Sequence, residues 1–330
     1  MRRGPEGVGL VLTEVCSLQF GAALAATLFP VLGPIGVVAG RLCGAAVALG
    51  MVAAAMRLRA PRAIRRAAGH RGLPVAFGVL TAVMNTCVYL ALDRLGLGTV
   101  ITLEFLGPLG LALALSRRWR DAGWAGCALA GVVLLGGGLA DPDPIGVVLA
   151  LVAAACWAGY ILLSRRIGSH GGVAELALAA VVAAASMLPF ALVSAGHALL
   201  GHPTAVGLGC LVGVVSSALP YALDLLALRR LPAQLFGVLM SVNPAVAALA
   251  GWLVLGQRMS GPQVVAVGLV VLASVGATAT SGAGSVAQQR DVVALVRVRL
   301  GLGQKRRHAL HRDRRRQPLQ TQGDDVRVVP

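Results

Sequence analysis

The chain has 330 residues, of which 57% are hydrophobic and 13% charged, and its mean hydropathy is +0.80. This composition excludes an ordinary soluble domain, in which about 25% of the residues are charged. The net charge of +16 is typical of nucleic-acid-binding proteins, but eleven of the 29 basic residues lie in the last 50 positions and fifteen more at the N-terminus or between apolar stretches. Membrane orientation explains that distribution more simply, so we do not expect nucleic acid as a partner.

Ten apolar stretches follow one another along the chain. Each has about 20 residues, the length of a helix that crosses a hydrocarbon core of about 30 Å. The sequence therefore predicts an all-α membrane protein with ten transmembrane helices. The predicted spans are residues 7–29, 33–56, 72–92, 95–115, 122–140, 144–164, 173–196, 205–228, 232–255 and 260–280.

The arginines between these stretches fall on alternate connections. Fifteen lie at the N-terminus and after the second, fourth, sixth and eighth stretches, whereas the opposite connections contain only Arg94 and Arg258. Short loops rich in Lys and Arg stay in the cytoplasm. We therefore expect both termini of the chain to be cytoplasmic.

The chain also repeats itself weakly. Aligning Pro108 with Pro244 places the sequence LALDRL, residues 90–95, on LALRRL, residues 226–231. Because five helices are an odd number, the second copy would enter the membrane from the opposite side, as in many secondary transporters. The sequence thus predicts two inverted five-helix repeats and alternating access. The predicted domains are a first repeat over residues 1–140, a second over residues 141–280 and a basic cytoplasmic tail over residues 281–330.

The tail has two interpretations. Its composition is typical of a disordered segment, which is the one we adopt. Alternatively, residues 286–302 form an amphipathic helix on the inner leaflet, and the basic cluster at residues 305–316 is attracted to anionic membrane lipids.

No motif for cofactor, metal or catalytic chemistry stands out. The six cysteines lie one per apolar stretch without a CxxC pair, the six histidines lie away from the middle of the spans, and there is no P-loop or GxSxG motif. We therefore expect no enzyme activity, no cofactor and no metal site.

Polar side chains inside the spans indicate where a polar solute would bind, because each is costly in lipid and is expected to face the bundle interior. In the first half, four lie at similar depth: Gln19, Arg41, Asn85 and Glu104. In the second half, five lie nearer the cytoplasmic ends: Tyr160, Tyr221, Asp224, Ser241 and Asn243. We expect Arg41 and Glu104 to pair in one conformation. A role as interhelical glue remains an alternative for Asn85, Ser216 and Ser217.

Glycine and proline positions predict close packing and breaks in the helices. Glycines spaced four residues apart, typical of closely packed helices, occur at Gly36, Gly40 and Gly44 and again at Gly209 and Gly213. Prolines that remove a backbone hydrogen bond inside a span, and so indicate a broken or a kinked helix, occur at Pro108, Pro220 and Pro244.

Several long motifs resemble those of a known family. They are SLQFGAALAATLFPVLGPIGVVAGR from Ser17, MNTCVYLAL from Met84, LEFLGPLGLAL from Leu103, ACWAGYIL from Ala155, SSALPYALDLLALRRLP from Ser216 and FGVLMSVNPAVAALAG from Phe236. Over residues 7–280 the chain resembles the threonine and homoserine exporter branch of the drug/metabolite transporter superfamily. Members of that superfamily are built from two EamA-type five-helix halves.

The resemblance implies proton-coupled export of small amino acids or related metabolites across the bacterial inner membrane, with a homodimer as a possible assembly. The substrate-binding residues that we assign from depth and resemblance are Gln19, Arg41, Asn85, Tyr89, Glu104, Tyr160, Tyr221, Ser241 and Asn243. The candidates for proton coupling are Glu104, Glu14 and Asp224. In the expected mechanism, Arg41 and Glu104 hold the two charges of a zwitterion, and protonation of Glu104 from outside favours release.

Two positions depart from the family pattern and keep other substrates open. Asn243 lies where the exporter branch tends to have Glu, and Gln257 replaces the acid of a common LGE motif. There are two alternatives. One is the export of drugs, which would use a larger apolar cavity with an acid, and the other is the transport of sugars or nucleotide-sugars by the same fold. The low aromatic content of 4% argues against sugar stacking.

Overall fold

The computed structural model describes residues 3–59, 72–115, 120–138, 143–168, 173–228, 230–231, 236 and 239–280. Every regular element in these ranges is a helix, which confirms the predicted all-α class for this part of the chain. Among the described helices, five are long and apolar enough to cross a membrane. They are α1 (Arg3–Ala26), α2 (Phe29–Arg59), α4 (Gly72–Leu92), α8 (Pro144–Gly168) and α9 (Val173–Gly201).

The remaining helices are apolar as well, and several follow one another as parts of one rod. One rod consists of α5 (Leu97–Glu104) and α6 (Leu106–Leu115), and another of α10 (Pro203–Gly213), the π-helix η1 (Val214–Ala218) and α11 (Leu219–Leu228). The others are α7 (Arg120–Gly138), α13 (Asn243–Leu255) and α14 (Gly261–Thr280). Within the described ranges the helices therefore form ten rods, in the order of the ten predicted spans.

The three prolines singled out in the spans lie where helical segments begin. Pro108 lies in the first turn of α6, Pro220 in the first turn of α11 and Pro244 in the first turn of α13. A proline fits the first turn of a helix because its missing N–H has no partner there in any case. In the ninth predicted span, residues 232–255, α13 begins at Asn243, and the described residues Phe236, Leu239 and Met240 before it are also helical.

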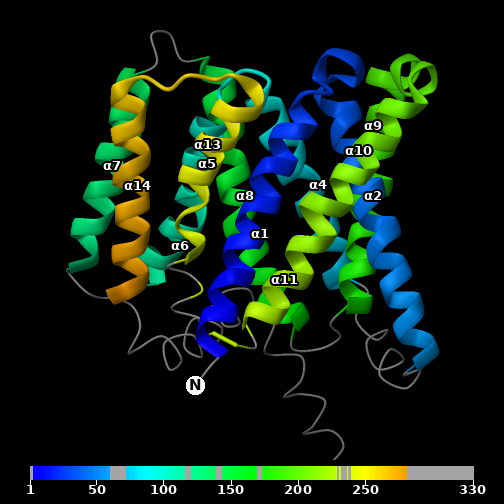
Figure 1. Cartoon of the computed structure of the whole chain (residues 1–330), viewed down its shortest axis with the longest axis horizontal. Coiled ribbons are helices and arrows are strands. Elements are labelled where there is room, and N and C mark those ends of the chain that lie inside the picture. The colour runs from blue at the N-terminus through cyan, green and yellow to red at the C-terminus, as the bar shows by residue number, and fades with distance from the viewer. Residues whose placement is uncertain are drawn as a thin grey trace, which may run out of the picture. The chain divides into compact units, whose positions relative to one another are not determined.

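In Figure 1 the rods run side by side and reverse direction from one to the next, so that the start of α1 and the end of α14 lie at the same end of the bundle. The most extensive packing pairs are α2 with α9, α7 with α14, α4 with α8 and α2 with α10. In addition, α4 packs against α9, α5 against α13, and α1 against α11 and α13. Each of these pairs joins a helix of the first half of the chain to one of the second.

Glycines bring α2 and α10 into backbone contact. A Cβ atom at Gly40 would lie 3.5 Å from the Cα of Gly209, whereas one at Gly44 would overlap the backbone carbonyl of Cys210. On the other helix, a Cβ atom at Gly213 would overlap the carbonyl oxygen of Arg41. Gly40 and Gly44 of the first predicted ridge thus face the second ridge, and this contact sets the position of Arg41 against η1, whereas Gly36 lies against Ala195 of α9.

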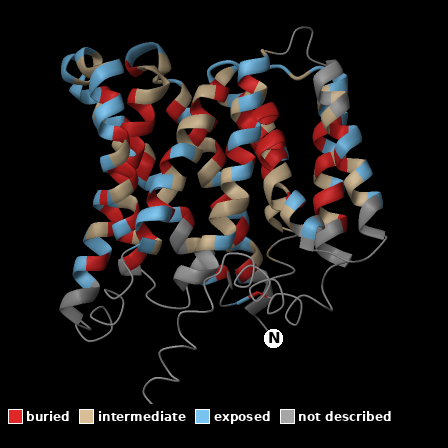
Figure 2. Ribbon diagram, turned by 180° about the vertical axis from the view of Figure 1, so that it is seen from behind, coloured by how far each residue is buried: buried red, intermediate tan, exposed pale blue. Residues whose placement is uncertain are grey.

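Buried residues lie between the rods and exposed residues on the outer faces (Figure 2). Many of the exposed residues are large and apolar. Val193 is 91% exposed, Leu200 83% and Phe190 65%. A helical bundle with such outer faces is suited to hydrocarbon rather than to water, since its backbone polar groups are satisfied within the helices.

Candidate functional site

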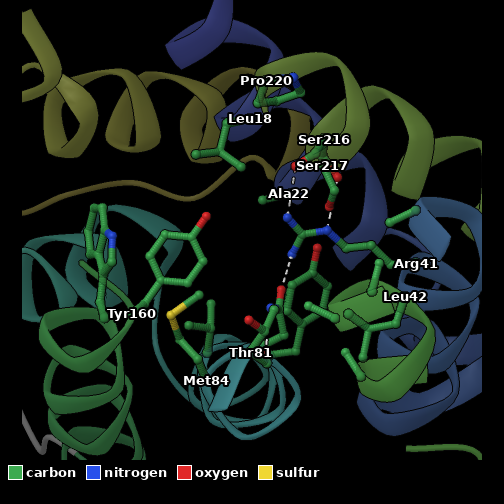
Figure 3. A pocket seen from close by; sticks show the side chains of 18 of the residues that line it. Leu18, Ala22, Arg41, Leu42, Thr81, Met84, Tyr160, Ser216, Ser217 and Pro220 are labelled. Atoms are coloured by element: carbon green, nitrogen blue, oxygen red, sulfur yellow. Dashed lines mark hydrogen bonds between the residues drawn. The ribbon is translucent and has the colours of Figure 1, made fainter. Parts of the chain in front are cut away.

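A cavity of about 180 Å³ lies within the bundle, between helices of both halves. Its walls come from α1, α2, α4 and α5 in the first half and from α8, α9, η1 and α11 in the second. The predicted residues that line it are Glu14, Gln19, Arg41, Asn85, Tyr89, Glu104 and Tyr160. Figure 3 shows Arg41 and Tyr160 extending into it from opposite sides.

The guanidinium of Arg41 is buried and held in place by neighbouring groups. Its Nε donates to Ser216 Oγ at 2.9 Å, Nη2 donates to the Ser216 carbonyl at 3.0 Å and Nη1 donates to Asn85 Oδ1 at 2.7 Å. The Tyr89 ring lies under it, with the ring centroid 5.3 Å from Cζ. These contacts fix the plane of the guanidinium and satisfy part of its hydrogen-bonding capacity, which makes its burial tolerable.

Sequence reasoning did not select Ser216 as a site residue, since an apolar helix uses many serines as glue. The sequence does contain a signal for it. A helical N–H four residues further on would normally bond to the Ser216 carbonyl, but that position is Pro220, which has no N–H. The chain forms a π-helix there, and the Ser216 carbonyl accepts from Arg41 instead.

Glu104 ends α5 at the cavity wall and is 7% exposed. Its carboxylate makes no hydrogen bond or ion pair within the described part of the chain, and the pair with Arg41 that we expect in one conformation is not formed in this one. Arg41 is held by Ser216 and Asn85 instead, so Arg41 and Glu104 do not neutralise each other directly. A second buried acid, Glu14, also lines the cavity.

Gln19 contacts the cavity, and behind it lies Asn243. Gln19 Nε2 donates to Asn243 Oδ1 at 2.8 Å, and Asn243 Nδ2 donates to the Met240 carbonyl at 2.9 Å. Both amides are buried, at 2% and 0% exposure. Asn243 is therefore not a wall of the cavity, because its side chain packs behind Gln19 and is used to hold it.

The other predicted residues are placed as follows. Ser241 is buried but does not line the cavity. The side chains of Tyr221 and Asp224 lie outside the described residues, so their assignments remain predictions. Gln257, one of the two departures from the family pattern, accepts a hydrogen bond from the Leu97 N–H at 2.9 Å and so caps α5 at the end opposite Glu104. Among the described residues, no group of His, Cys, Asp and Glu could hold a metal ion.

Comparison with known proteins identifies the chain. The EamA-like transporter family matches residues 144–279. The threonine/homoserine exporter RhtA of Escherichia coli K12 is 39% identical over 287 residues, which cover 86% of this chain and 95% of that protein. The protein of the same name from Salmonella typhimurium LT2 is 40% identical over 82% of this chain and 90% of its own length.

A solved crystal structure with 20% identity aligns over 84% of this chain and 99% of its own, with a TM-score of 0.58, and it supports the fold alone. The similarity to the exporters, in contrast, reaches 39–40% identity and covers most of this chain and of those proteins. The chain belongs to the EamA-like transporter family, as an RhtA-like member.

Proposed function

We propose that this protein exports a small amino acid, such as threonine or homoserine, from the cytoplasm across a bacterial inner membrane. The observation that carries the proposal is that the cavity wall has a buried base, Arg41, and a separate buried acid, Glu104, beside the further acid Glu14. A zwitterion brings one anion and one cation, so it satisfies both charges without adding a net charge to a site of low dielectric. The bacterial relatives are named threonine/homoserine exporters, which supports the same substrate class.

Arg41 has hydrogen-bonding capacity left for a carboxylate. A guanidinium has five N–H groups, and three of them donate to Ser216 and Asn85, one from each nitrogen. One N–H therefore remains on each terminal nitrogen, and a bidentate carboxylate requires two. Glu104 supplies a negative charge for the ammonium group at another part of the wall.

The volume of the cavity supports a small solute. Pockets for drug-sized ligands have volumes of about 300–1,000 Å³, whereas this cavity has about 180 Å³. A multidrug exporter would need a larger site than this conformation provides. The two buried charges also suit an amino acid better than a neutral sugar, for which they would remain unpaired.

Two chain corners support an inverted repeat and thereby alternating access. At the first, the Ala91 carbonyl accepts from the N–H groups of Arg94 and Leu95 at 3.0 and 2.7 Å. At the second, the Ala227 carbonyl accepts from the N–H groups of Arg230 and Leu231, both at 2.8 Å. These are the positions that the sequence repeat aligns, and the corners lie at opposite ends of the bundle (Figure 1).

Each corner also contacts the start of a helix from the other half. A Cβ atom at Gly146, near the start of α8, would meet Leu95, and one at Gly7, near the start of α1, would meet Leu231. An ion pair accompanies each contact: Arg94 Nη1 lies 2.7 Å from Asp143 Oδ2, and Arg230 Nη1 lies 3.5 Å from Glu6 Oε2. Such matched contacts support two related closures, one at each end, as inverted-repeat transporters use.

We further propose that Glu104 couples export to protons. A carboxylate holds the substrate ammonium group, and a protonated carboxyl group does so less well, so protonation from outside would favour release. Glu14 also lines the cavity and is the second candidate in the described part of the chain. Asp224 remains a prediction from the sequence.

The test is a competition panel in inside-out vesicles that contain the protein, with a controlled pH gradient and labelled threonine as the transported probe. Threonine and homoserine should compete, and 2,3-dihydroxybutanoate, which lacks the amino group, should not. A panel in which a cationic dye or a sugar is transported and no amino acid competes would refute the proposed function.

A further inference from the structure

The amide of Gln19 has an unused acceptor in the wall of the cavity. Gln19 is 2% exposed and lines the cavity, and its Nε2 is used by Asn243. Its Oε1 is buried and has no hydrogen-bond partner among the described residues. A buried acceptor without a partner is costly, so its presence in a ligand cavity indicates a ligand that donates a hydrogen bond.

The orientation of this amide is determined by its neighbours. The Met240 carbonyl can only accept, so Asn243 must turn its Nδ2 toward it, as the distance of 2.9 Å indicates. Asn243 Oδ1 then faces Gln19, so Gln19 must donate to it through Nε2. A flipped Gln19 would place two oxygens against each other. The relay from Met240 through Asn243 thus leaves Gln19 Oε1 as the free group.

We infer that Gln19 Oε1 accepts an N–H from the primary ammonium group of the substrate, alongside Glu104, and that Asn243 is a positioning residue that keeps Gln19 in this orientation. The inference rests on the proposed function of the cavity and deepens it, because it predicts a specificity for amines with several N–H groups. A carboxylate and an amide oxygen together require two N–H donors, and a primary ammonium group has three.

The test compares threonine with N,N-dimethylthreonine, whose ammonium group has a single N–H. Affinities are measured on the purified protein by calorimetry, together with other primary amines and their N,N-dimethyl forms. The wild-type protein should bind threonine on the order of 10- to 100-fold more tightly than its dimethyl form, as expected for one hydrogen bond to a charged group. In Gln19→Leu this ratio should fall toward one.

Two substitutions at position 243 separate positioning from folding. Asn243→Asp keeps an oxygen toward Gln19 Nε2 but loses the donor to the Met240 carbonyl, so it should retain the affinity ratio even where it lowers stability. Asn243→Leu loses both and should lower the ratio as Gln19→Leu does. Because Asn243 acts through Gln19, the double variant should have the same ratio as Gln19→Leu alone.

The outcomes of this experiment are distinct. A panel in which no primary amine binds more tightly than its N,N-dimethyl form overturns the inference, and so does an Asn243→Leu variant with the wild-type ratio. A panel in which other primary amines show the preference but threonine and homoserine do not bind overturns only the proposed substrate and leaves the role of Gln19 standing.

Discussion

Replacing Arg41 by Lys tests the recognition of a carboxylate in the cavity. Lysine keeps the positive charge, but its single ammonium group cannot reproduce the fork that donates to Ser216 and Asn85 and still leaves two N–H groups for a ligand. A hydrogen bond to a charged group contributes about 1.5–3 kcal/mol. Losing one such bond to the substrate would therefore weaken threonine binding about 10- to 100-fold.

The assay is the binding of threonine and threoninol, in which an alcohol replaces the carboxylate, to purified wild-type and Arg41→Lys proteins. Threonine affinity should fall by that factor, whereas threoninol affinity should change little, because threoninol makes no bidentate contact with the guanidinium. Equal losses for both ligands would indicate general damage to the cavity, and unchanged threonine binding would refute the assignment of Arg41.

Three further changes test coupling, packing and closure. Glu104→Gln should abolish the pH dependence of threonine transport in vesicles between about pH 5 and 8. Asp143→Asn should retain that dependence. The hydrogen bond from Arg94 holds the pKa of Asp143 below its usual range, so Asp143 stays a carboxylate over this pH range and would lose the ion pair only at more acidic pH. Gly213→Ala should lower stability by about 1–3 kcal/mol in thermal unfolding, because its Cβ overlaps the Arg41 carbonyl, whereas Gly207→Ala in the same helix meets nothing and should be neutral. Arg94→Asp should change the transport rate by a few-fold at most, as expected for an exposed ion pair. Adding Asp143→Arg to the same chain reverses the pair and should restore the rate. A double variant as impaired as Arg94→Asp alone would argue against a role of this pair in closure.

The depth of a residue along its helix could be predicted from the sequence. Gln19, Arg41, Asn85 and Glu104 were placed in one layer by counting from the span ends, and the structure brings all four to one cavity. Depth follows from helical rise and from the lengths of the apolar stretches, which are fixed by the bilayer. The breaks at Pro108, Pro220 and Pro244 follow equally from backbone chemistry.

The direction of a side chain around its helix could not be predicted in the same way. In a soluble helix the apolar stripe marks the inner face, but helices in lipid are apolar on both faces, so their periodicity carries little information. Asn243 was therefore expected to contact substrate although its side chain packs behind Gln19. The sequence also does not separate Ser216 from Ser217 as a site residue, because only the relation of Ser216 to Pro220 distinguishes the two serines.

The polar contacts around the cavity cross from one half of the chain to the other. Arg41 bonds to Ser216, Gln19 to Asn243 and the start of α5 to Gln257. The two side chains that we propose to hold the cargo, Arg41 and Gln19, are therefore also side chains that bond one half to the other. Any rearrangement of the halves that breaks these bonds consequently alters the binding groups at the same time.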